Sequence, residues 1–169
     1  MGPKRRDLLK LDRVIGLNSN SSCSLSVVSG NCLLYFAGTV VIRLDVTSGV
    51  QKAFYRATKP ISCITVSSDG SVLAAGERGH QPSVLVWDMA TSALLVSIAG
   101  HSQGISCLAF SPDANYLVSV GFKFDKQLFL WNWKEKKVLS TQKVGNKVKM
   151  VKYSPDGAYD TFLMSGLFF

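Results

Sequence analysis

The stretch at residues 110–121, FSPDANYLVSVG, has two relatives elsewhere in the chain. These are VSSDGSVLAAG at 66–76 and YSPDGAY at 153–159, and the aspartates of the three stretches lie 44 and 43 residues apart. A second marker has the same period, since Trp87 in VWD and Trp131 in LWN are 44 residues apart. Two independent markers with one period predict a chain built from repeated structural units.

Each unit has the pattern of four short β-strands. In the clearest unit, segments rich in apolar, β-branched and aromatic residues cover 104–110, 116–120, 127–131 and 137–141. The SPDAN sequence between the first two is typical of a turn, because Pro presets φ and the Asp and Asn side chains bond the local backbone. Four strands at this spacing are typical of one blade of a β-propeller. No apolar period of 3.6 residues favours helices, so we predict an all-β fold.

The repeat predicts a partial propeller of about three and a half blades. The predicted blades lie at about 23–56, 60–98, 101–142 and 146–159, the last of them incomplete. Residues 1–13 form a basic lead-in to the blade region at 14–159, and 160–169 form an atypical apolar C-terminus. Because complete propellers have about four to eight blades, we interpret the chain as a fragment, a truncated gene model or a splice form. Open sheet edges of such a chain favour self-association.

Charge and hydropathy narrow the classes of partner. The 169-residue chain has a formal net charge of +8, with basic residues near the N-terminus and between 123 and 152. Such an excess favours acidic partners, although a solvated surface is the simpler interpretation. No nucleic-acid-binding motif accompanies it, and no apolar stretch reaches the roughly 18 residues of a membrane span. We therefore expect no nucleic acid and no membrane as partners.

The cysteines and histidines show no metal-binding spacing. Cys23, Cys32, Cys63 and Cys107 each lie in an apolar, strand-like context, which predicts reduced core thiols in a cytosolic protein. No nucleophile and base are suggested as a pair, and GERG at 76–79 lacks the lysine of a phosphate-binding loop. We predict that the chain is not an enzyme and has no catalytic residue, metal or cofactor.

One unit carries a recognisable polar signature. Gly100-His101, followed by DKQLFLWN at 125–132, resembles the signature of WD repeats. In that family a His, a Ser or Thr, a turn Asp and a Trp form a hydrogen-bonded set within the blade. The resemblance implies that the set here is His101, Ser119, Asp125 and Trp131, with Trp87 and Asp88 as the Trp-Asp pair one blade earlier. We expect a structural role, because buried polar groups must be satisfied.

Two further segments point to a narrower family. The leader at 11–49 and the stretch from 74 to 121, with its AAGERGHQPSVLVWD, are similar to the mitogen-activated protein kinase-binding protein 1 family, which includes a spindle-pole WD-repeat paralogue. Gly79, His80, Gln81 and Pro82 form the marker turn of this resemblance. We expect His80 to hold that turn in place of the usual Asp, with a surface contact as the lesser alternative. Echinoderm microtubule-associated protein-like proteins share the GHQP segment and are the rival family.

The resemblance implies a function as well as a fold. It implies a non-catalytic scaffold module that binds other proteins, among them stress-activated kinases or cytoskeletal proteins. It also implies a cytoplasmic location that extends to the cytoskeleton, the centrosome and the spindle pole. The alternative is a microtubule-associated propeller whose basic surface meets the acidic tails of tubulin.

Overall fold

The structure is a computed structural model that describes residues 11–17, 24–28, 30–145, 148–153 and 162–165. Every regular element in this part of the chain is a β-strand. Blade 1 consists of β1 (Leu25–Val28), β2 (Cys32–Ala37), β3 (Val40–Asp45) and β4 (Gln51–Arg56). Blade 2 consists of β5 (Ile61–Val66), β6 (Val72–Glu77), β7 (Ser83–Asp88) and β8 (Leu94–Ala99). Blade 3 consists of β9 (Ile105–Phe110), β10 (Tyr116–Gly121), β11 (Gln127–Asn132) and β12 (Lys137–Lys143).

A two-stranded sheet follows blade 3. It pairs β13 (Met150–Tyr153) with β14 (Phe162–Ser165) in antiparallel register. The turn at 154–159 lies outside the described residues, as do 1–10 of the basic lead-in. Part of the apolar stretch predicted at 160–169 therefore supplies a second strand to the fourth sheet.

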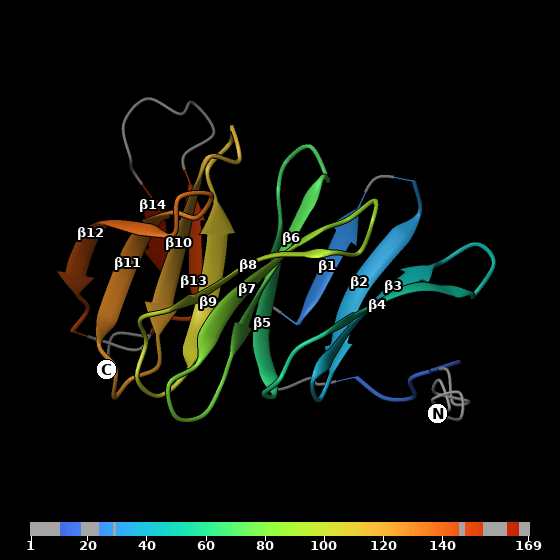
Figure 1. Cartoon of the computed structure of the whole chain (residues 1–169), viewed down its shortest axis with the longest axis horizontal. Coiled ribbons are helices and arrows are strands. Elements are labelled where there is room, and N and C mark those ends of the chain that lie inside the picture. The colour runs from blue at the N-terminus through green and yellow to red at the C-terminus, as the bar shows by residue number, and fades with distance from the viewer. Residues whose placement is uncertain (1–10, 18–23, 29, 146–147, 154–161, 166–169) are drawn as a thin grey trace, which may run out of the picture.

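The sheets are arranged as neighbouring blades. Within each four-stranded sheet the strands pair in chain order and antiparallel. The first strands of successive sheets contact one another, β1 with β5, β5 with β9 and β9 with β13. Figure 1 shows the sheets side by side, from blue blade 1 to the orange and red strands near the C-terminus. This arrangement confirms the all-β, partial-propeller prediction.

The core lies between the blades. Blade 2 and blade 3 share one apolar cluster, which includes Val86, Phe129 and Trp131, and two further clusters separate blade 1 from blade 2 and blade 3 from β13. All six residues of β6 are buried, whereas all seven residues of β12 are exposed. A strand such as β6 has a neighbouring blade on both faces, so its sequence is a nearly continuous apolar run, broken only by Glu77 at its end.

Buried thiols occupy equivalent places on the inner strands. The Sγ of Cys63 lies 3.6 Å from the carbonyl oxygen of Ile105, and the Sγ of Cys107 lies 3.7 Å from that of Val148. Cys63 thus faces the first residue of β9, and Cys107 faces the segment that leads into β13. Cys32, Cys63 and Cys107 are buried, and Cys23 lies outside the described residues.

Candidate functional site: the buried hydrogen-bond chain of blade 3

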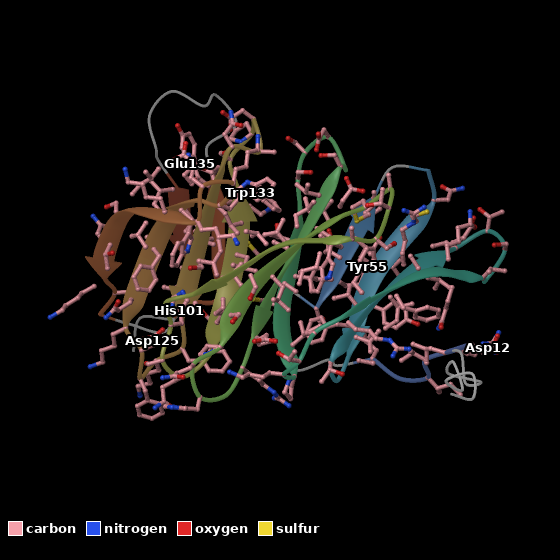
Figure 2. The ribbon with its side chains drawn as sticks, in the orientation of Figure 1. Asp12, Tyr55, His101, Asp125, Trp133 and Glu135 are labelled. Atoms are coloured by element: carbon pink, nitrogen blue, oxygen red, sulfur yellow. The ribbon has the colours of Figure 1, made fainter. Side chains whose placement is uncertain are left out.

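The polar residues predicted for blade 3 lie on four different segments that meet inside the blade. His101 lies in the β8–β9 connection, Ser119 on β10, Asp125 in the β10–β11 turn and Trp131 on β11. His101 Nε2 is 2.7 Å from Ser119 Oγ, and Trp131 Nε1 is 2.8 Å from the same oxygen. His101 Nδ1 bonds the Oδ2 of Asp125. Figure 2 shows His101 and Asp125 together at the lower end of the blade.

The direction of each hydrogen bond follows from what each group can donate. The indole N–H of Trp131 can only donate, so Ser119 Oγ accepts from it and gives its own hydrogen to His101 Nε2. The Nδ1–H of His101 then donates to the Asp125 carboxylate. One neutral tautomer of the imidazole satisfies every member of the chain.

Burial supports that neutral form. The His101 side chain is 1% exposed, and its burial lowers the pKa of the imidazole below 6.5, against the opposing pull of Asp125. Desolvation disfavours the charged imidazolium. At neutral pH the hydrogen bonds therefore join one anion, one neutral ring and one hydroxyl.

Two glycines leave room for this chain. A Cβ on Gly100 would lie 2.7 Å from the Trp131 ring, and a Cβ on Gly121 would lie 2.1 Å from the Asp125 carboxylate. Both distances are shorter than real contacts. The Gly-His pair of the signature is therefore a packing requirement, because the glycine makes space for the same tryptophan that the histidine reaches through Ser119.

Asp125 also ties two connections of the loop end together. Its Oδ1 accepts from the Ser102 hydroxyl at 2.9 Å and from the Ser102 backbone N–H at 3.4 Å. Its own N–H donates to the Phe122 carbonyl at 2.8 Å. The carboxylate thus fixes the β10–β11 turn against the β8–β9 connection.

Trp87 and Asp88 have separate tasks in blade 2. Trp87 is 2% exposed, and its ring centroid lies 6.0 Å from that of Tyr55 in the cluster between blades 1 and 2. The Oδ1 of Asp88 accepts from the N–H groups of Ala90 and Thr91 at 3.0 and 2.7 Å. These bonds lower the pKa of Asp88, those of Thr91 most. The tryptophan fills the core, and the aspartate caps the turn that follows β7.

The prediction for His80 is wrong. His80 is exposed, and the side chain that bonds the surrounding segments is an acid, Glu77 at the end of β6. Glu77 is 1% exposed, its Oε1 accepts from the Thr58 hydroxyl at 2.9 Å, and its Oε2 accepts from the Ser83 N–H at 3.0 Å. The His80 imidazole does not hold the turn, because the Glu77 carboxylate already bonds both sides of it from inside the blade.

The equivalence of Thr58 and Ser102 explains this substitution. The two residues lie 44 positions apart, and each bonds a buried carboxylate through its hydroxyl and its backbone N–H. Blade 2 has Ala75 where blade 3 has Ser119, so the His-Ser-Trp part of the chain is missing from blade 2. An acid inside an otherwise apolar strand, VLAAGE, was the sequence signal for Glu77.

The marker turn connects blade 2 to blade 3. The Gly79 N–H donates to the Gln103 carbonyl at 3.1 Å, and the Gln81 N–H donates to the Ser102 carbonyl at 3.0 Å. Gly79 has φ +112, a backbone conformation that favours glycine. Pro82 is buried. The turn therefore joins adjacent blades through its backbone.

Asp125, His101 and Ser119 have the connectivity of a hydrolytic triad, but their position prevents such chemistry. Ser119 is 0% exposed, and its oxygen already accepts from Trp131 while its hydrogen goes to His101. A nucleophile must reach a substrate carbonyl, and no substrate atom can reach this oxygen.

In the described residues, no group of three or more His, Cys, Asp or Glu side chains could hold a metal ion. The same residues contain no helix able to cross a membrane.

Comparison with known proteins defines the class of repeat. Segments 49–88 and 92–132 match the family model described as WD domain, G-beta repeat. The chain thus carries WD repeats, and each matched segment runs from the outer strand of one blade through three strands of the next, β4–β7 and β8–β11. Each sequence repeat therefore contributes strands to two neighbouring blades, and the apolar clusters between the blades hold them together.

Relatives and a solved structure agree with this class. WD repeat-containing protein 62 of Mus musculus is 33% identical over 151 residues, which are 88% of this chain and 10% of that protein. Mitogen-activated protein kinase-binding protein 1 of Mus musculus is 34% identical over 163 residues, 94% of this chain and 11% of that protein. A chain in the crystal structure of the mitotic checkpoint complex has a TM-score of 0.69 at 24% identity, covers 78% of this chain and 40% of its own length, and supports the fold. The present chain spans about a tenth of these two relatives.

Proposed function

We propose that the chain is a non-catalytic protein-interaction module of a kinase-pathway scaffold. The observation that carries this proposal is the internal use of the blade's reactive groups. His101, Ser119 and Asp125 satisfy one another inside blade 3, which leaves the connections between strands as the surface offered to partners. Rigid scaffolds that present loops are a common basis for binding.

Mitogen-activated protein kinases are the partners we propose first. The support is the name and the 34% identity of mitogen-activated protein kinase-binding protein 1, which matches along 94% of this chain. Stress-activated members of that kinase class are the narrower proposal. The relatives reported above do not favour the microtubule-associated alternative.

Direct binding tests this proposal. The purified chain is immobilised, and stress-activated kinases are passed over it in biolayer interferometry, with an unrelated protein kinase as the control. We expect saturable binding of the former and a dissociation constant in the micromolar range, about −8 kcal/mol. Equal or absent binding of both kinases would refute the kinase proposal.

We propose a cytoplasmic location for the module, with enrichment at the centrosome and spindle pole. The support is the similarity of the chain to the family described above, which includes a spindle-pole paralogue. Live imaging of a fluorescent fusion through mitosis tests it, with the fluorescent protein alone as the control. A fusion that is distributed like the control at every stage would contradict the enrichment.

We also propose that copies of the chain associate through the outer face of blade 1. On β1, Val27 is 80% exposed and Leu25 is 47% exposed. In blades 2 and 3 the equivalent inner strands are covered by a neighbouring sheet. Size-exclusion chromatography with light scattering is expected to show dimers that a V27D variant reduces, and a stable monomer of the unmodified chain would overturn the proposal.

A further inference from the structure

The acidic side chains of the described blades that are not buried lie at one end of the strands. Because successive strands are antiparallel, the β4–β5, β6–β7, β8–β9 and β10–β11 connections all lie at one end. We call this end, at 57–60, 78–82, 100–104 and 122–126, the loop face. The turns after β3, β5, β7, β9 and β11 lie at the opposite end, where Figure 2 shows Trp133 and Glu135.

The acids of the loop face are buried and bonded. Glu77 is 1% exposed and the Asp125 side chain is 4% exposed, and both carboxylates accept hydrogen bonds on each oxygen. The remaining acids of the described blades, Asp45, Asp69, Asp88, Asp113 and Glu135, all lie at or beside the turns of the opposite end. Asp12 precedes blade 1 and lies far from blade 3 in Figure 2. The described part of the loop face therefore offers no exposed carboxylate.

The basic side chains of the loop face point to an anionic partner. The exposed ones, in these connections or at the strand ends beside them, are Arg56, Arg78, Lys123, Lys126 and Lys143. Lys59 is half-buried, and its Nζ donates to the carbonyl oxygens of His80 and Gln81. Within the described part of the chain the ion pair is Lys52–Asp45, which involves none of them, and the neutral His101 hydrogen-bonds Asp125. Side chains of one sign with no local counter-charge attract a partner of the opposite sign.

An apolar side chain stands among these charges. Phe124 is 81% exposed at the tip of the β10–β11 turn, beside Lys123 and two residues before Lys126. The turn is held from inside by Asp125, and the Lys126 N–H bonds the Phe122 carbonyl at 3.2 Å. Phe124 is thus presented on a fixed turn, which reduces the entropy lost when a partner covers it.

We infer that the loop face of blade 3 binds an acidic peptide segment that contains an apolar residue. The segment's carboxylates would meet Lys123, Lys126 and Arg78, and its apolar residue would cover Phe124. A single-stranded nucleic acid fits less well, because such sites stack successive bases on several aromatic rings and Phe124 is the one largely exposed aromatic among the described residues. The inference rests on the proposed interaction function and names the partner chemistry.

Fluorescence anisotropy of the full chain tests this inference. The probe is a labelled peptide with a central leucine flanked by glutamates, and the variants are K123E/K126E and F124S. We expect each variant to weaken binding about tenfold, because several rim ion pairs, or one buried aromatic, supply that factor. Raised salt is expected to weaken binding further.

A charge-matched control comes from the same blade. Lys136 and Lys137 are exposed at the opposite end, so K136E/K137E changes the net charge equally and is expected to change the affinity by less than about twofold. Thermal melts establish that all variants remain folded. Equal weakening by both double variants, or no binding by the unmodified chain, would overturn the inference.

Two further arms separate other outcomes. A labelled oligothymidine that binds more tightly than the peptide, and loses affinity in K123E/K126E, would overturn the choice of a peptide. A kinase that binds the unmodified chain and K123E/K126E equally would support the proposed interaction function and would show that the kinase binds outside the loop face. If the kinase binds but the unmodified chain does not bind the acidic peptide, the acidic-peptide inference is refuted and the proposed interaction function is not.

Discussion

Replacing Asp125 with alanine is expected to destabilise blade 3 without opening a large cavity. The change leaves the Nδ1–H of His101, a buried donor, without its acceptor. A buried group left unsatisfied costs about 1–3 kcal/mol, and the lost bonds to the more exposed Ser102 add about 0.5–1 kcal/mol. We therefore expect D125A to lower the free energy of unfolding by about 1.5–4 kcal/mol.

Urea and thermal unfolding, followed by tryptophan fluorescence, measure this effect. For a chain of this size about 2–4 °C of Tm corresponds to 1 kcal/mol, so the midpoint should fall by about 3–16 °C. D125N should cost less, because its amide oxygen can still accept from the imidazole. E135A, an exposed acid in the same blade, is the control and should stay within about 0.5 kcal/mol. Equal stability of D125A and E135A would refute the satisfaction argument.

Three more predictions concern the same blades. E77A should lower the free energy of unfolding by about 2–4 kcal/mol, whereas H80A should change it by less than about 0.5 kcal/mol; urea melts compare them, and the reverse order would restore His80 as the holder. G100A forces a Cβ against Trp131 and should cost about 1–3 kcal/mol, with a normal Tm as the contrary result. Because burial lowers the folded-state pKa of His101, the unfolded chain binds the proton first, so stability should decline as pH falls below about 6.5. H80A removes the other histidine, and a flat pH profile in that variant would contradict the assignment.

The number and order of strands in each blade could be predicted from the sequence, because they depend on its periodicity. Repeated turns and the two tryptophans were enough to predict four-stranded blades, because strand length and turn chemistry are local properties. The positions of His101 and Asp125 followed from a family resemblance. Their contact could not be derived locally, since it depends on how the β8–β9 connection folds against a turn 24 residues later.

Glu77 shows where local reasoning ended. The sequence places His80 in the hairpin that corresponds to the Asp125 turn one blade later, and the prediction gave it the role of the usual Asp. The structure uses a longer side chain from the end of β6 to reach Thr58 and Ser83. Glutamate has one more methylene than aspartate, so Glu77 can start from the end of β6 and still bond Thr58, the equivalent of Ser102. One-dimensional alignment does not measure that reach.

The two buried acids connect the stability of the blades with their proposed binding surface. Since Glu77 and Asp125 are used inside, the exposed charge of the described loop face is positive. D125A removes a negative charge, so simple electrostatics would strengthen binding of an acidic peptide. If Asp125 orders the turn that presents Phe124, D125A should instead weaken binding at temperatures where the blade is still folded. Weaker binding by D125A, together with unchanged binding by E135A, would show that the hydrogen-bond chain acts on recognition by positioning Phe124; tighter binding would show that only charge matters.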